Sequence, residues 1–247
     1  MNHELFLVLL LAHILGDFYF QSDASCADKR SRTWKSPYLY LHPTIIGLLS
    51  FAAVCQVSFL PWMLVLILSH ILIDGVKAGR QDNLMAFLLD QALHLVILVA
   101  VSSMCTNQID WIREIHLNVN AISVPVFMTA LLLCLKPANL LVKYVLEKYV
   151  LIKPMYEKNE ISAQEELQEE AVKVGALIGS LERSLFLIFV VMGQYGAVGF
   201  ILAAKSIIRY REGSTSKTEY VLAGTLLSLG IAVVCGIAVR IFSPIFL

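Results

Sequence analysis

The segment LLLAHILGDFYFQSD (residues 9–23) places a histidine and an aspartate four residues apart inside an apolar run. The same arrangement recurs in LILSHILIDGVK (66–77), and LLDQALHL (88–95) carries the pair in the reverse order. On an α-helix, positions i and i+4 lie on one face. Three apolar segments therefore each present one imidazole and one carboxylate in the same direction. The pairs are His13 with Asp17, His70 with Asp74, and Asp90 with His94.

The composition indicates a membrane protein that crosses the bilayer several times. The 247 residues are 58% hydrophobic and only 15% charged, and the mean hydropathy is +0.73. Soluble domains usually contain about a quarter charged residues. Lysine plus arginine and aspartate plus glutamate number 19 each, so no basic excess suggests nucleic-acid binding. The five cysteines are scattered without a CxxC motif, which argues against a disulfide framework or a thiolate zinc site.

Apolar runs long enough to cross a bilayer predict five membrane helices before residue 137. They lie at about 3–21, 38–57, 60–78, 84–104 and 120–136. The next stretch, 137–153, mixes lysine and tyrosine with apolar residues, as an amphipathic helix at the interface would. Ser162 and Glu165 form a capping box that predicts the start of a polar helix. The segment 176–210 is either one span or a hairpin broken at 193–196, and a last helix is expected at about 219–241.

These elements predict an all-α membrane bundle with about six to eight membrane helices. We expect four parts: a four-helix core (1–104), a fifth membrane helix with an interfacial helix (105–153), an acidic cytoplasmic helix (154–175) and C-terminal membrane helices (176–247). The positive-inside rule places the basic connections around Lys29 and Lys77 in the cytoplasm and the N-terminus outside it. The same rule favours the hairpin.

Seven polar residues are expected to lie at the same depth in the membrane. His13 and Asp17 end the first span, His42 begins the second, His70 and Asp74 end the third, and Asp90 and His94 begin the fourth. Because consecutive helices alternate in direction, all seven fall roughly 5–15 Å from the cytoplasmic boundary. Ionisable groups inside a membrane are costly and usually functional.

Imidazole and carboxylate together suit Zn²⁺, Mn²⁺ or Fe²⁺. Seven candidate ligands exceed the needs of one tetrahedral ion, so we expect one or two ions. A two-ion site activates water and holds both oxygens of a displacement at phosphorus. One carboxylate, Asp17 or Asp90, is expected to act as the general base. Gln21, Lys77 and Gln91 are expected to contact the ligands or the substrate.

Two other interpretations of the seven residues remain open. Membrane histidines and aspartates also form hydrogen bonds between helices, and chains of them relay protons or ions. A transport path would continue through the outer half of the bilayer. The outer halves of the first four predicted helices are almost wholly apolar, which favours a pocket open only to the cytoplasm.

The three segments quoted above, with the pair Leu41-His42, resemble an uncharacterised bacterial membrane family catalogued only as a domain of unknown function (DUF3307). Segments 178–189, 199–209 and 219–229 are similar to its longer members. The pattern also resembles membrane-bound metal-dependent hydrolases. That resemblance implies a site at His13, Asp17, His42, His70, Asp74, Asp90 and His94, in the bacterial inner membrane.

We therefore expect a metal-dependent hydrolase that acts on a lipid-linked phosphate or ester from the cytoplasmic side. The alternative is a non-enzymatic protein that uses the same cluster, either a proton- or ion-coupled transporter or a sensor or effector subunit. Membrane lipid is an expected partner, with a cytoplasmic protein at the acidic segment 158–173 and a second copy of the chain as further candidates.

Overall fold

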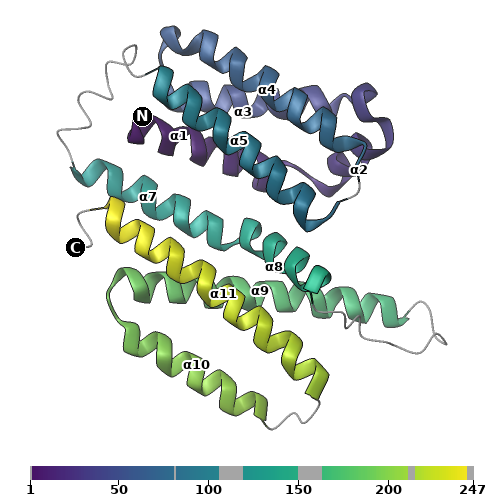
Figure 1. The fold of residues 1–247 in the computed structure, drawn as a ribbon, viewed down its shortest axis with the longest axis vertical. Coiled ribbons are helices and arrows are strands. Elements are labelled where there is room, and N and C mark those ends of the chain that lie inside the picture. The colour runs from purple at the N-terminus through teal and green to yellow at the C-terminus, as the bar shows by residue number, and fades with distance from the viewer. Residues whose placement is uncertain (1, 81, 106–118, 150–162, 211–214, 244–247) are drawn as a thin grey trace. The chain divides into compact units, whose positions relative to one another are not determined.

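The computed structural model describes residues 2–80, 82–105, 119–149, 163–210 and 215–243. Within these ranges every regular element is a helix (Figure 1). Among the described residues, six helices are long and apolar enough to cross a membrane, or seven if one bent pair is a single span. The predicted all-α membrane bundle is thus confirmed. The chain divides into two compact units, with the boundary between Thr129 and Ala130. The finer division into four parts stays a prediction.

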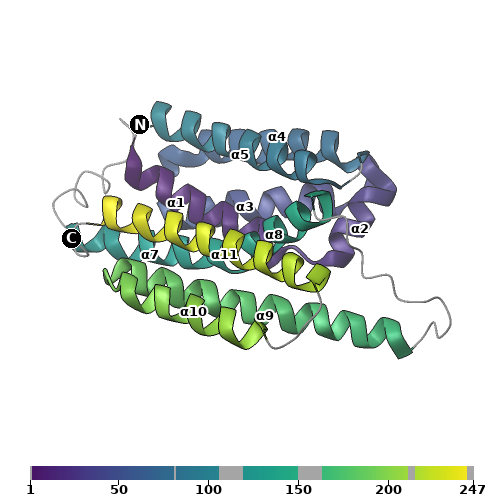
Figure 2. The same ribbon diagram turned by 60° about the horizontal axis from the view of Figure 1, so that its bottom comes forward.

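Four helices of the first unit form an up-and-down bundle. They are α1 (His3–Ile14), α3 (Tyr38–Val54), α4 (Leu60–Ala78) and α5 (Leu84–Met104). Helices α1 and α4 each pack against both α3 and α5, so the four close into a ring (Figures 1 and 2). Both α4 and α5 have the predicted bounds, and Pro61 lies in the first turn of α4 as expected. Helix α3 ends at Val54 rather than 57, because Cys55 adopts a left-handed backbone with φ of 53°.

The first membrane span is not α-helical throughout. After α1 it continues as a π-helix, η1 (Leu15–Phe20), whereas the sequence predicted one α-helix to about residue 21. A π-helix uses i→i+5 hydrogen bonds, and short examples occur frequently at functional sites. A Cβ atom on Gly16 would lie 2.2 Å from Cγ1 of Ile46, so the glycine is what allows η1 to lie so close to α3.

A short polar helix lies at the end of the bundle where η1 ends and α3 begins. It is α2 (Asp23–Arg32), followed by the short helix η2 (Thr33–Lys35), and the pair bends by 111° from α3. The sequence predicted only a basic loop here. The hydroxyl of Ser22 accepts the amide N–H of Ser25, which caps α2. A Cβ on Gly75 would lie 2.4 Å from the Trp34 ring, so the missing side chain lets η2 pack against α4.

The other end of this bundle is apolar. Its core residues come from the first half of α1, the end of α3, the start of α4 and the second half of α5, with η3 (Val57–Phe59) between α3 and α4. The buried members are Leu5, Leu9, Val54, Phe59, Leu66, Leu98, Val101 and Cys105. The first unit therefore has one polar end and one mainly apolar end, where Asn2, Glu4 and Ser102 are also buried.

The second unit is built from the later helices. Helix α7 (Val119–Cys134) crosses the boundary between the units, and α8 (Lys136–Tyr149), α9 (Ala163–Val191), α10 (Tyr195–Tyr210) and α11 (Thr215–Phe242) follow. Helix α9 packs against α8, α10 and α11. It begins directly after Ser162, as the capping box predicted. The hairpin between α9 and α10 turns at Gly193, whose φ is 71°, which agrees with the predicted break.

Two predictions for the middle of the chain stay predictions. Only Leu135 separates α7 from α8, and by length and composition Ser123–Tyr149 could also be one membrane span, so the interfacial position predicted for 137–153 is not decided. The expected docking segment 158–173 lies partly outside the described residues, and the side chains of its remainder are not described. It therefore stays a prediction.

Arg183 links its own helix, α9, to three other helices, α7, α8 and α11, inside the second unit. Its side chain is buried on α9, and its Nε donates to the carbonyl oxygen of Cys134 at 2.5 Å. The guanidinium also donates to the hydroxyl of Ser228 at 3.1 Å and to the side-chain oxygen of Asn139. A Cβ on Gly179 would lie 3.1 Å from the guanidinium, so the small residue leaves room for it.

Candidate metal centre

The predicted His/Asp residues lie together at the polar end of the first unit. Six of the seven form three overlapping groups in which one ligand atom from each residue lies within 4.8 Å of the others. The groups are His13, Asp17 and His94; Asp17, His42 and His70; and His70, Asp74 and His94. The short connections make consecutive helices alternate in direction. This alternation brings the His and Asp residues to one depth.

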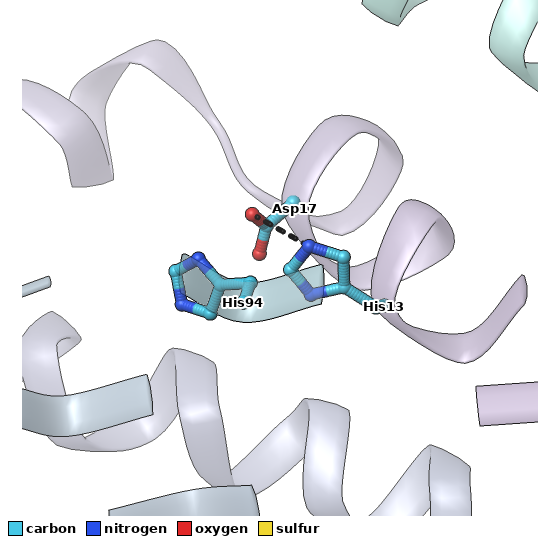
Figure 3. A group of neighbouring side chains, drawn as sticks. All are labelled: His13, Asp17 and His94. Atoms are coloured by element: carbon cyan, nitrogen blue, oxygen red, sulfur yellow. Dashed lines mark ion pairs between the residues drawn. The ribbon is translucent and has the colours of Figure 1, made fainter. Parts of the chain in front are cut away.

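Asp17 occupies the centre of the cluster. Its Oδ1 lies 3.0 Å from Nε2 of His42 and 3.3 Å from Nε2 of His70. Its Oδ2 lies 3.6 Å from Nε2 of His13, the contact drawn in Figure 3 beside the ring of His94. The Asp17 side chain is only 10% exposed, so little water shields these contacts.

The four imidazoles are buried and adjacent. The ring centroids of His70 and His94 are 4.0 Å apart, those of His13 and His94 are 4.9 Å apart, and those of His42 and His70 are 5.1 Å apart. The Nε2 atoms of His13, His70 and His94 have no hydrogen-bond partner among the described residues. Buried polar atoms are normally paired, because an unpaired one costs about 1–3 kcal/mol.

The hydrogen bond of Nδ1 in His94 determines which ring nitrogen of this residue can bind a metal ion. Its Nδ1 lies 2.9 Å from the backbone oxygen of Asp90, so Nδ1 carries the proton and donates it. Nε2 then keeps its lone pair. Metal-binding histidines are usually held in this way, with one nitrogen donating to a carbonyl or carboxylate and the other facing the ion. Three buried imidazoles with unpaired Nε2 atoms around a carboxylate therefore fit a divalent metal ion.

Two lysines hold the remaining carboxylates. Nζ of Lys29 donates to Oδ2 of Asp74 at 2.6 Å, and Nζ of Lys77 donates to Oδ2 of Asp90 at 2.7 Å. The second oxygen of Asp74 lies 3.8 Å from Nε2 of His70. Asp90, although predicted as a ligand, belongs to none of the three groups. Its Oδ1 is buried without a hydrogen-bond partner among the described residues.

The predicted supporting residues differ in their contacts. Lys77 holds Asp90, as just described. The side-chain nitrogen of Gln91 donates to Oδ2 of Asp17 and to Oδ2 of Asp90, each at 3.1 Å, so it links the ligand groups to Asp90. Gln21 ends η1, and its buried side-chain nitrogen has no hydrogen-bond partner among the described residues.

Sequence reasoning missed Lys29, which it counted only as a positive-inside residue. The signal for its helix was present, because Ser22 and Asp23 are typical of a helix start and the basic residues gather in the last turn. The pattern did not show which basic residue faces the bundle. In the structure Lys29 is buried, whereas Arg30 and Arg32 are exposed.

The donor set suits a borderline divalent cation. Imidazole nitrogen and carboxylate oxygen are ligands of Zn²⁺, Mn²⁺ and Fe²⁺, and helix bundles hold such ions with inward-facing side chains. No thiolate is among the candidate ligands in the described part of the chain.

Residues 5–123 match the model of a family described as a protein of unknown function (DUF3307). The match covers α3, α4 and α5, all of α1 except its first two residues, and every residue of the cluster. It supports the resemblance to an uncharacterised family for this part of the chain, and the resemblance suggested for 178–229 stays a prediction. No curated protein and no solved structure matched the chain.

Proposed function

We propose that this chain is a membrane-embedded, metal-dependent hydrolase that acts on a lipid-linked phosphate or ester from the cytoplasmic side. The observation that carries the proposal is the set of three buried imidazoles, from His13, His70 and His94, that gather around Asp17 while their Nε2 atoms make no hydrogen bond among the described residues. Hydrogen bonds between helices normally pair buried polar atoms of this kind.

The residues divide into holding and reacting groups. The four histidines, with Asp17 and Asp74, would hold the ion. A bound divalent ion supplies activation of water and polarisation of a phosphoryl or carbonyl oxygen. Asp90 is the better candidate for general base, because it lies outside the ligand groups and Lys77 and Gln91 fix only its Oδ2.

The charge of the site favours an anionic substrate. Its three carboxylates and two lysine ammonium groups leave one formal negative charge when the imidazoles are neutral, so a divalent ion makes the site positive. Buried net charge is costly in a membrane. A phosphate group would neutralise it, whereas a carboxylic ester would not. Lys77, with a side chain 33% exposed, is placed to meet such a group.

The position of the cluster supports a one-sided site. Among the described residues, the core at the opposite end of the bundle is mainly apolar, and its buried polar side chains include Glu4 and Ser102. A proton- or ion-coupled transporter would need a more continuous polar path. By the positive-inside rule, the basic residues of α2 and η2 support a cytoplasmic location for the polar end. The family resemblance supports the bacterial inner membrane as its location.

The first test is the metal content of the detergent-purified full chain, measured by mass spectrometry after incubation with Zn²⁺, Mn²⁺ or Fe²⁺. A His70→Ala/Asp74→Ala variant removes two candidate ligands. The matched control is Lys143→Ala/Glu147→Ala, an exposed pair with the same spacing on α8. Stoichiometric metal in the wild type and the control, lost from the His70/Asp74 variant, is the expected result.

The second test is hydrolysis. The metal-loaded protein is incubated with phosphatidic acid in mixed micelles, and inorganic phosphate is measured; p-nitrophenyl butyrate tests for esterase activity. Phosphate release that depends on metal and on Asp90 would support the proposal for a phosphate substrate. A well-folded protein that binds no metal would overturn it and leave the transporter or sensor as the better hypothesis.

A further inference from the structure

We infer that the cluster is a two-ion centre in which the carboxylate of Asp17 bridges the ions. This inference rests on the proposed function and deepens it, because the charge of two ions favours a phosphate ester over a neutral carboxylic ester as the substrate. It comes from the way in which the two oxygens of Asp17 face different histidines.

The two oxygens of Asp17 serve different sides of the cluster. Oδ1 lies 3.0 Å from Nε2 of His42 and 3.3 Å from Nε2 of His70. Oδ2 lies 3.6 Å from Nε2 of His13, which groups with His94. The group of His13 and His94 and the group of His42 and His70 share Asp17 and no other residue.

Each side has enough donors for its own ion. His13 and His94 form one side with Oδ2 of Asp17. His42 and His70 form the other with Oδ1, and Asp74, whose Oδ1 lies 3.8 Å from Nε2 of His70, is available to it. The His70 and His94 ring centroids are only 4.0 Å apart, so the two sides are adjacent. Ions in two-metal sites are usually about 3.5–4 Å apart.

The repeated HILGD and HILID segments give this arrangement a simple origin in the sequence. Each contributes one histidine and one aspartate, from α1 with η1 and from α4. Asp17 lies in the π-helical turn, which sets it between α3 and α5, and Gln91 on α5 holds its Oδ2 at 3.1 Å. Helix bundles hold paired ions in the same manner, with carboxylates and histidines from facing helices.

The charge of a second ion favours an anionic substrate. Two divalent ions would add four positive charges to a buried site whose own formal charge is only one negative. That excess requires an anion in contact with both ions. A phosphate ester supplies charged oxygens at the reacting centre, and phosphatases, polymerases and nucleases use two-ion sites to act on phosphorus. A neutral carboxylic ester does not meet this requirement.

The test uses Mn²⁺ with the detergent-purified full chain. Bound manganese is counted by mass spectrometry after gel filtration, and electron paramagnetic resonance distinguishes a coupled pair from isolated ions. We expect two Mn²⁺ per wild-type chain and a coupled signal. These wild-type measurements decide the inference even where a variant fails to fold.

Single-residue variants then test whether Asp17 is the residue that bridges the two ions. His13→Ala and His42→Ala should each retain one Mn²⁺ with the signal of an isolated ion. Asp17→Asn should lose the coupled signal. The controls are Asp82→Asn, whose carboxylate pairs with Arg30 outside the cluster, and His3→Ala on the exposed start of α1; both should keep two coupled ions.

The outcomes separate this inference from the proposed function. One Mn²⁺ per wild-type chain with an isolated-ion signal would overturn the two-ion centre but leave a one-ion hydrolase standing. No bound metal in folded protein would overturn both. Coupled ions that survive Asp17→Asn would refute the bridge.

Discussion

Replacing Gly16 with alanine should separate η1 from α3 and disturb the metal centre. The added Cβ would lie 2.2 Å from Cγ1 and 2.8 Å from Cδ1 of Ile46, where ordinary contacts begin near 3.4 Å. Either Ile46 or η1 must therefore move by about 1 Å, and such overpacking usually costs about 1–3 kcal/mol. Because Asp17 is the next residue, the same movement should lower the bound metal.

The structure also predicts a rescue. Ile46→Ala removes the two nearest carbons and leaves Cβ at 3.5 Å, which is an ordinary contact. Alone, Ile46→Ala should destabilise the protein by about 2–5 kcal/mol through the cavity it leaves. In the double variant the new methyl group partly fills that cavity. The double variant should therefore be more stable than the sum of the single effects by about 1–3 kcal/mol.

The assay is unfolding of the detergent-purified protein by added sodium dodecyl sulfate, followed by tryptophan fluorescence, with bound Mn²⁺ counted in parallel. Gly79→Ala is the matched control, since no atom lies within 4 Å of its added Cβ. The reasoning would be refuted if the effects of the two single substitutions were strictly additive. It would also be refuted if Gly16→Ala were as stable as Gly79→Ala and bound as much Mn²⁺.

Three further substitutions test other contacts. Arg183→Met removes hydrogen bonds to three partners, of which Cys134 and Ser228 are buried, and should lower the free energy of unfolding by about 1–3 kcal/mol; an unchanged midpoint in the same assay would contradict this. Gly193→Ala places a Cβ on a residue with φ of 71° and should cost about 1–2 kcal/mol, which the midpoint also measures. Lys29→Met removes the ion pair with Asp74 that ties α2 to α4, so trypsin should cleave after Arg32 faster; equal cleavage rates would contradict the tie.

Much of the bundle could be predicted because its determinants are local. The lengths of the apolar runs and the polar residues between them set the bounds of α4 and α5. Alternating direction, together with the four-residue spacing of His70 and Asp74, was enough to predict that the polar residues share one end of the bundle.

The features that could not be predicted depend on packing between distant segments. The π-helical turn around Asp17 forms where Gly16 meets Ile46 on α3, and the local sequence does not contain that contact. The same is true of Lys29, since several basic residues precede α3 and only the fold determines which one reaches Asp74. The sequence likewise did not show that Asp90 would be held by Lys77, outside the ligand groups.

The buried guanidinium of Arg183 has a consequence for how the chain enters the membrane. An arginine at the centre of a lone helix costs about 2.5–3.5 kcal/mol on insertion. Cys134 and Asn139 are synthesised before α9, but Ser228 follows 45 residues after Arg183. We expect α9 to leave the insertion machinery already paired with the preceding helices, and the last partner to arrive only with α11. Truncation before α11 should therefore leave a biogenesis intermediate that quality-control proteases recognise, even though each remaining helix is present.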